Sequence, residues 1–577
     1  MCSSDLKVLT FILTGVKLKT IQKENGGFYM RKWIALVCSC MLLLAGCSTK
    51  EEGTAGSGQT PTNDSAETNE LTVAVGAQFT TLDPALNSEL INGYVMQHTY
   101  STLFTKDEDN NLIEDLAESC DISEDGLTYT VKLKEGIQWS DGVPLTAEHF
   151  RYGIVRALTY GAENAWSIYN LVTYLDGAAA YESDDTQDAE TLQIPGVQAV
   201  DDTTLVFQLT KPCAFFKALL NSYAFMPVRA DFAPQHDSTW SFAPGYPSVG
   251  PYILEECNEN DKIVVTKNEN YYRADEITLD KITFQVMTDM DAQALAFKNN
   301  DIDIALRVNS SLPLTYENKE ELWKVESPSN YFLVINSGPT GPEWMKDVRV
   351  RRALALAIDK EAMVTAVGDP SYYVPLDGYV PNGLKGAEKD FRTESDEKEK
   401  FLQYDPEEAR RLLKEAGYDE TNPLKITYKY SQTTLHADVA AVLQGMWKAI
   451  GVECDLEVVE SGVYYNQIFN GDFEIARYGY TASDDPSQFL TLWTTTQQQT
   501  PAVDDPEYDK MMDAATYIVD YTEYMEALHD IEHYLVQEQV YLIPLFNYGD
   551  PMLKKTYVKN TTHVGATPFY GYCTIEK

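Results

Sequence analysis

The sequence predicts a mixed α/β (α+β) protein that is built from more than one lobe. Runs rich in β-branched residues, such as 71–75 and 128–133, have the composition and spacing of strands. Helical segments alternate with these runs along the chain. The 577 residues, 44% of them hydrophobic, are too many for a single hydrophobic core of ordinary domain size. We therefore expect two or three lobes with a cavity between them.

Each predicted element follows from a local pattern. Asp141-Gly142 and Pro144 interrupt the chain, and Thr146 is then expected to cap a helix that begins with Ala147. A second helix is predicted from Pro406 to Ala416, closed by Gly417. The other predicted strands are 204–209, 262–266, 281–286 and 425–428.

The charge balance excludes one class of partner. The chain has 45 Lys and Arg residues against 88 Asp and Glu residues, which gives a formal net charge of −43. A nucleic-acid-binding protein needs a basic surface to neutralise phosphates. We therefore expect no nucleic-acid partner.

The N-terminal region predicts export. Met30-Arg31-Lys32 precedes an apolar run, 33–45, and the segment Leu44-Ala45-Gly46-Cys47 places small residues before a cysteine. This arrangement resembles a bacterial lipoprotein signal. The run is shorter than the roughly 20 residues that span a bilayer, so a transmembrane anchor is the weaker interpretation.

These features divide the N-terminal region into three parts. We interpret residues 1–29 as a start-site artefact, 30–46 as the signal peptide and 47–70 as a flexible tether, because the tether has almost no large apolar side chains. Lipidated Cys47 would hold the protein on the outer face of the cell membrane, or on its periplasmic side.

No motif in the sequence predicts an enzyme, a metal site or a cofactor. A nucleophile elbow, a Walker loop, a GxGxxG loop and a CxxC pair are all missing from the sequence. His529-Asp530-Ile531-Glu532-His533 matches the H-x-x-E-H pattern of inverted zinc proteases. However, Leu528, Ile531 and Leu535 mark the apolar side of this helix, so we expect both histidines on its solvated face.

Several segments together resemble one family. Residues 127–150, which contain Gly136-Ile137-Gln138-Trp139-Ser140-Asp141-Gly142, are similar to the signature block of the family 5 extracellular solute-binding proteins. These are the dipeptide and oligopeptide receptors of ABC importers. The resemblance continues in the family's order through 249–252, 300–305, 347–359, 404–418 and 543–545, so that it spans 71–577.

The resemblance implies a type II periplasmic-binding fold with two main lobes, a hinge and an extra inserted lobe. Lobe I would comprise 71–98, 246–325 and 541–577, the extra lobe 99–245, and lobe II 326–540. A monomer would capture oligopeptides in the cleft between the lobes, close over them and deliver them to the permease and ATPase subunits of an ABC importer. Alternatives are a sugar or a nickel complex as the ligand, a sensory or adhesion role, and a secreted hydrolase.

The resemblance also implies a set of ligand-binding residues. Arg477 and His436 occupy positions that meet a peptide's C-terminal carboxylate, and Gly479-Tyr480-Thr481 resembles a strand that pairs with the peptide main chain. The family's ammonium-binding Asp falls in a segment that is one residue shorter here. We favour Asp484 for this role, because a hydroxyl would not offset the desolvation of an enclosed ammonium. Ser483 and Asp485 remain open as alternatives.

Overall fold

The computed structural model describes residues 69–107, 111–161, 166–324, 328–369, 371–482, 485–498, 500–549, 551–564 and 567–577. The predicted signal peptide, Cys47 and nearly all of the predicted tether lie outside these residues, as do Ser483 and Asp484.

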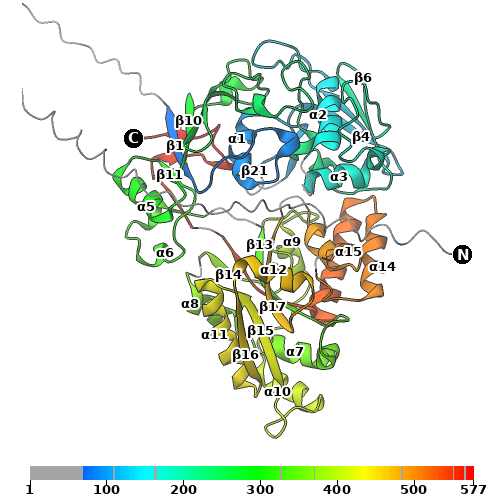
Figure 1. Cartoon of the computed structure of the whole chain (residues 1–577), viewed down its shortest axis with the longest axis vertical. Coiled ribbons are helices and arrows are strands. Elements are labelled where there is room, and N and C mark those ends of the chain that lie inside the picture. Colours follow the sequence, from blue (N-terminus) through cyan, green and yellow to red (C-terminus); the bar gives the residue numbers. More distant parts are fainter. Residues whose placement is uncertain are drawn as a thin grey trace, which may run out of the picture. The chain divides into compact units, whose positions relative to one another are not determined.

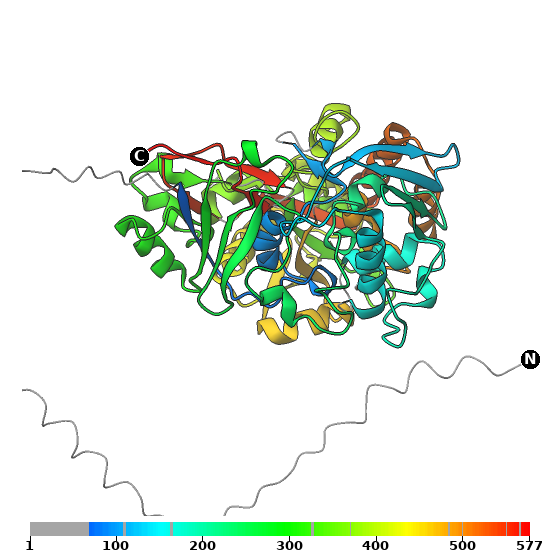
Figure 2. The same cartoon turned by 90° about the horizontal axis from the view of Figure 1, so that it is seen from above.

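A seven-stranded mixed sheet gathers strands from the beginning, the middle and the end of the described chain (Figures 1 and 2). Its order is β12-β19-β11-β1-β10-β9-β8. The strands are β1 (Glu70–Val75), β8 (Tyr252–Asn258), β9 (Lys262–Lys267), β10 (Lys281–Val286), β11 (Ile304–Ala305), β12 (Leu322–Trp323) and β19 (Met552–Lys554). β1 pairs in parallel with both neighbours, β10 and β11. Consecutive residues Val73, Ala74 and Val75 are fully buried, as expected for a central parallel strand.

A six-stranded sheet has the order β14-β18-β13-β17-β15-β16. Its strands are β13 (Ser329–Ile335), β14 (Tyr373–Pro375), β15 (Lys425–Ser431), β16 (Glu453–Val459), β17 (Ile475–Thr481) and β18 (Leu542–Tyr548). β13 sends alternate side chains to two different hydrophobic clusters. Tyr331 and Leu333 pack with the helices on one face, and Phe332 and Val334 belong to the cluster on the other. β18 lies within 541–577, the range that we assigned to lobe I, and pairs with β13 and β14.

Four helices cover one face of this sheet. Trp447 is fully buried there, and its indole N–H donates to the carbonyl of Leu354 at 3.0 Å. The helices are α7 (Val348–Leu356), α8 (Lys360–Val367), α10 (Pro406–Glu415) and α11 (Thr434–Ala449). The predicted helix that begins at Pro406 is confirmed and ends one residue earlier than expected.

The region 99–245 contains an antiparallel sheet of order β4-β5-β7-β6. Its strands are β4 (Ala117–Ile122), β5 (Thr128–Leu133), β6 (Val197–Asp201) and β7 (Thr204–Gln208). Helix α2 (Ala147–Tyr160) begins where Thr146 predicts, and His149 completes a capping box with Thr146. The ring Nδ1 of His149 accepts the backbone N–H of Thr146 at 3.1 Å.

The remaining elements connect these sheets. The short strand pairs are β2 (Phe104–Lys106) with β3 (Leu112–Glu114), β20 (Val558–Lys559) with β23 (Thr574–Ile575), and β21 (Thr562–Val564) with β22 (Thr567–Phe569). The remaining helices are α1 (Leu90–Thr99), α3 (Trp166–Tyr174), α4 (Phe216–Leu219), α5 (Met290–Asn299), α6 (Leu312–Thr315), α9 (Phe391–Lys398), α12 (Ser461–Phe469), α13 (Ser487–Leu490), α14 (Pro506–Thr516) and α15 (Tyr521–His533). The predicted mixed α/β class is confirmed.

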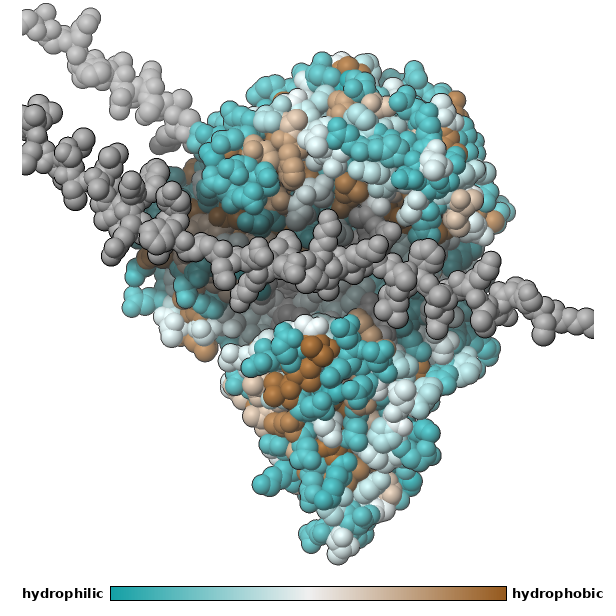
Figure 3. Space-filling view, viewed as in Figure 1, coloured by the Kyte–Doolittle hydropathy of each residue, from teal (hydrophilic) through white to brown (hydrophobic). Residues whose placement is uncertain are grey.

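The face seen in Figure 3 is mostly hydrophilic, with apolar side chains in small patches. Among the described helices, none has the length and apolar character needed to cross a bilayer.

Candidate ligand-binding site

A cavity of about 630 Å³ is lined by described residues from five parts of the chain: 87–107 with Ile113 and Asp115, 221–226, Pro251 with Tyr271 and Arg273, 480–482 with Gln488, and 562–563 with Thr567, Phe569 and Tyr572. This volume falls within the range of small-molecule and peptide-sized sites. The aromatic side chains in its lining belong to Tyr100, Tyr223, Tyr271, Tyr480, Phe569 and Tyr572. Aromatic rings offer contact area to varied ligands, and the tyrosines add a polar tip.

The C-terminal end of β17 reaches this cavity. Tyr480 and Thr481 are both part of the lining, and Ala482 follows them. The backbone N–H of Tyr480 donates to the side-chain oxygen of Asn330 on β13 at 3.1 Å. The Tyr480 ring meets Phe489 edge to face, with ring centres 5.2 Å apart. These contacts fix the orientation of the strand end.

One edge of β17 is open near the cavity. β13 pairs with β17 along its whole length, from Ile475 to Thr481, whereas the register of β15 with β17 covers only Ile475 and Ala476. Backbone groups of successive strand residues point to opposite sides. Because Tyr480 donates toward β13, Gly479 and Thr481 present their backbone groups to the side that β15 leaves uncovered among the described strands.

Arg477 and His436 come together on the helix-covered face of the same sheet. The guanidinium carbon of Arg477 lies 5.0 Å from the centre of the Tyr331 ring, and the Tyr331 hydroxyl is 3.2 Å from Nδ1 of His436. Arg477 also donates from Nη1 to the hydroxyl of Tyr465 at 3.2 Å. Burial, with a smaller effect of the Arg477 charge, lowers the pKa of His436 to about 3. His436 is therefore neutral at physiological pH, and Arg477 carries the positive charge of the pair.

The predicted site residues do not all converge. Tyr480 and Thr481 belong to the described lining of the cavity, whereas Arg477 and His436 do not. Arg477 is opposite Leu333 and faces the helices, while Tyr480 projects to the other face. Thr481 shares the face of Arg477 but lies four residues further on, at the end of β17 that reaches the cavity. Gly479 lies between them, half-buried.

Asp485, one of the alternatives for the ammonium-binding role, is buried and hydrogen-bonded to other residues of the protein. Its side chain is 1% exposed, and Oδ1 accepts the backbone N–H of Ser487 at 2.8 Å and the Tyr524 hydroxyl at 2.9 Å. In this arrangement the Asp485 carboxylate stabilises the start of α13 and its contact with α15. Asp484, which we favour for the ammonium, is outside the described residues.

The charged residues of the cavity wall include Glu89, Lys106 and Asp107 as well as Asp115 and Arg273, and the last two were missed from the sequence. Asp115 follows β3 directly, and Arg273 lies in the loop after β9. Neither residue belongs to a motif or to a periodic pattern. Only the three-dimensional packing of these distant loops brings them to the cavity.

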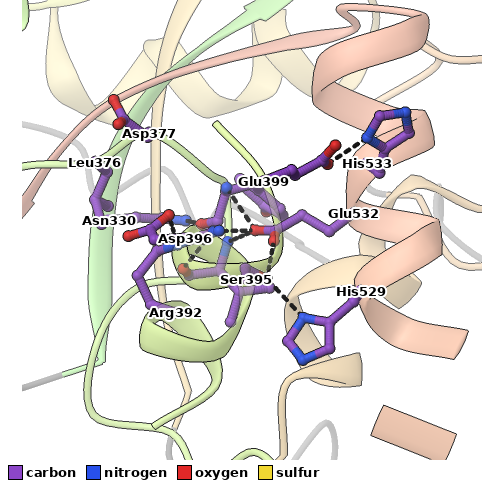
Figure 4. A network of polar contacts seen from close by, with 12 residues as sticks. Asn330, Leu376, Asp377, Arg392, Ser395, Asp396, Glu399, His529, Glu532 and His533 are labelled. Atoms are coloured by element: carbon purple, nitrogen blue, oxygen red, sulfur yellow. Dashed lines mark hydrogen bonds and ion pairs between the residues drawn. The ribbon is translucent and has the colours of Figure 1, made fainter. Parts of the chain in front are cut away.

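The H-x-x-E-H segment on α15 lies against α9 (Figure 4). Oε1 of Glu532 accepts the backbone N–H groups of Tyr379 and Val380 and the Nη1 of Arg392, each at 2.7 Å. Nδ1 of His529 is 2.6 Å from the hydroxyl of Ser395. Glu532 is fully buried and His529 is 8% exposed.

The prediction that both histidines lie on a solvated helix face is therefore wrong for His529, and Glu532 is buried beside it. Helix α9 and the chain around Val380 cover that side of α15, and Arg392 compensates the buried charge. Within the described residues, no three His, Cys, Asp or Glu side chains are grouped so that they would hold a metal ion. The motif instead ties α15 to α9.

Comparison with known proteins adds independent information. A family model described as bacterial extracellular solute-binding proteins, family 5 Middle, matches residues 111–501. The oligopeptide-binding protein OppA of Bacillus subtilis is 27% identical over 553 residues, which cover 94% of this chain and 98% of that protein. The periplasmic murein peptide-binding protein MppA of Escherichia coli is 27% identical over 555 residues, covering 92% and 96%.

Solved structures agree with this similarity. An unliganded open form of the periplasmic murein tripeptide-binding protein MppA superposes with a TM-score of 0.76 at 26% identity, covering 88% of this chain and 98% of that chain. A second structure, of the Escherichia coli murein tripeptide-binding protein MppA, gives a TM-score of 0.65 at 26% identity and covers 89% and 99%.

Proposed function

Because the chain belongs to the family 5 bacterial extracellular solute-binding proteins, we propose that it captures short peptides outside the cytoplasm and delivers them to an ABC importer. The observation that carries this proposal is the open edge of β17 at the cavity. A peptide that adds to this edge as a further strand is held by its backbone, which is common to all sequences.

The positions of the predicted residues fit this mode of binding. A peptide added beside β17 lies in the plane of the sheet, between its two faces. Arg477 on one face and Tyr480 on the other then flank the same peptide. In our proposal Arg477 provides the charge for the C-terminal carboxylate, His436 a neutral hydrogen-bonding group, and Asp484 the partner of the α-ammonium.

The printed names of the relatives support a peptide ligand. OppA of Bacillus subtilis is an oligopeptide-binding protein, and MppA of Escherichia coli is a murein peptide-binding protein. Both are similar to this chain over nearly its whole length. We propose the same class of ligand here, and we propose that the protein binds it as a monomer without turning it over.

The remaining parts of the proposal rest on the sequence. Lipidation of Cys47 would anchor the protein to the membrane, and the tether up to residue 70 would let the folded body reach the permease. We keep the division into lobe I, lobe II and an extra lobe as part of the proposal, with closure of the lobes as the step that encloses the peptide.

Calorimetry with N-methylated peptides tests the backbone-recognition mode. Starting from a tripeptide that binds, each amide is methylated in turn, and in parallel each side chain is replaced. Methylation of an amide that pairs with β17 should weaken binding by about tenfold or more, because a buried acceptor is left unsatisfied. Replacement of side chains by Ala should cost less. The opposite ranking would refute strand addition, and product formation would identify a hydrolase.

A further inference from the structure

Asp115 places a carboxylate in the wall of the cavity. The residue is 5% exposed, and it contributes to the cavity lining. Thr102 and Tyr271, which also line the cavity, lie beside it. A buried carboxylate is costly unless hydrogen bonds or a cation compensate its desolvation.

Hydrogen bonds from Tyr272, Thr102 and Ser101 hold the Asp115 side chain in place. The hydroxyl of Tyr272 donates to Oδ1 at 2.6 Å, and the backbone N–H of Thr102 donates to Oδ2 at 3.2 Å. A carboxylate has about four acceptor positions on its two oxygens. These three donors therefore fix the orientation of the group and leave acceptor capacity for a further donor.

The cations near Asp115 are engaged elsewhere. No Lys or Arg among the described residues forms an ion pair with its carboxylate within 4.0 Å. Arg273 instead bonds Glu276, with Nε 3.0 Å and Nη2 2.5 Å from Oε2. Its guanidinium lies 5.5 Å from the centre of the Tyr572 ring. Lys134 donates to the backbone carbonyl of Asp115.

Together these interactions do not fully offset the desolvation cost of the Asp115 carboxylate. Burial raises the pKa of Asp115, against the opposing effects of the Tyr272, Thr102 and Ser101 hydrogen bonds and of the Arg273 charge. A cationic group of the ligand in the cavity would offset this desolvation cost. Tyr271 and Tyr572 stand in the same wall, and aromatic rings also favour a cation.

We propose that Asp115 forms a cation-recognition subsite that accepts an ammonium or guanidinium group of the bound ligand. This inference rests on the proposed function, since it assigns to a peptide receptor a preference for positively charged peptides. The group has two sources, a basic side chain or the α-ammonium, and in the second case Asp115 would take the role that we propose for Asp484.

The test uses tripeptides of alanine with one lysine at the first, second or third position. Each is paired with the peptide in which norleucine replaces lysine, which removes the ammonium and keeps most of the apolar chain. Nα-acetylated versions of both are also titrated. Calorimetry is performed on the wild type, on Asp115→Asn, and on Asp121→Asn as a matched control. Asp121 is an exposed carboxylate on β4, outside the cavity lining.

The wild type should bind one lysine peptide about tenfold or more tightly than its norleucine partner, and Asp115→Asn should abolish this preference while Asp121→Asn keeps it. If acetylation, rather than the exchange of lysine for norleucine, removes the part of the affinity that depends on Asp115, then the group bound by Asp115 is the α-ammonium. Either result supports the subsite.

An equal effect of Asp115→Asn on charged, acetylated and norleucine peptides would overturn the inference. If Asp115→Asn does not fold, Tyr272→Phe is used instead, because it removes the hydrogen bond to Oδ1 and keeps the carboxylate. This variant should change the preference for the lysine peptide more than the affinity for the norleucine peptide. An unchanged preference would overturn the inference. Wild-type protein that binds no peptide at all contradicts the proposed function itself. Wild-type protein that binds all the peptides equally contradicts only the subsite.

Discussion

The guanidinium carbon of Arg477 lies 5.0 Å from the centre of the Tyr331 ring. Both side chains project from the helix-covered face of the six-stranded sheet, from strands that are hydrogen-bonded neighbours. The ring and the Tyr465 hydroxyl hold Arg477 close to the open edge of β17. A cation held in this way is prepared for an anionic partner.

We expect Arg477→Gln to weaken binding of peptides with a free C-terminal carboxylate by about 2–5 kcal/mol, because the change strands the other charge of an enclosed pair. C-terminally amidated peptides lack that charge, and the substitution should leave their affinity nearly unchanged. Calorimetry with the free and the amidated peptide, on the wild type and on Arg477→Gln, completes the double-mutant cycle. Equal losses for free and amidated peptides would show that Arg477 does not recognise the carboxylate.

His98 makes stability depend on pH. Nδ1 of this buried ring lies 2.8 Å from the carbonyl of Tyr94, Nε2 accepts the backbone N–H of Tyr570 at 3.0 Å, and burial lowers its pKa to about 3. The unfolded chain binds this proton near pH 6.5, so the free energy of unfolding falls as the pH drops from about 6.5 toward 3.

In the His98→Gln variant this contribution is missing. The variant should be less stable at neutral pH. Between pH 6 and 4, the free energy of unfolding of the wild type should fall with each pH unit by about 1.4 kcal/mol more than that of the variant. Urea titrations at several pH values measure the difference. Parallel pH profiles for the two proteins would contradict a neutral, buried His98.

Glu532 should be a strong contributor to stability. Its carboxylate is fully buried and bonds Arg392 at 2.7 Å, so Glu532→Ala leaves a buried guanidinium whose remaining carboxylate partner is Asp396. Breaking a buried pair from one side costs about 3–5 kcal/mol. Asp530→Ala on the same helix removes only an exposed partner of Lys398 and should cost less than about 1 kcal/mol. Similar unfolding midpoints for both variants would contradict the described network.

Cys47 is the expected lipid attachment site. Cys47→Ser should release the protein from the membrane fraction and leave peptide affinity unchanged, because the proposed role of Cys47 is to carry the lipid and not to contact the peptide. Fractionation of cells and calorimetry on the released protein check both parts. A variant that remains in the membrane fraction would disprove lipid anchoring through this residue.

Local patterns predicted the individual elements of the fold. The strand of Leu71 to Val75 and the helix begun by Thr146 appear where β-branched composition and capping place them. The partners of these elements were not predictable from such patterns. β19 joins the sheet of β1 although nearly the whole described chain separates them. Pairing of this kind depends on long-range packing rather than on the sequence of either strand.

The candidate site was predictable to a similar degree. A strand was correctly expected at Tyr480 and Thr481, which line the cavity, but strand alternation turns Arg477 to the face opposite to Tyr480. The burial of Glu532 was missed because its compensating charge, Arg392, belongs to a distant helix. Asp115 carries no local signal, since its importance arises from the loops that surround it.

Native mass spectrometry of the protein purified from rich medium tests peptide capture most directly. An enclosed ligand with a slow off-rate survives purification. We predict a distribution of bound masses that fragment as short peptides of varied side chains, and their release on unfolding. A single bound sugar or a metal complex in their place, or protein that stays empty and binds no added peptide, would contradict the account.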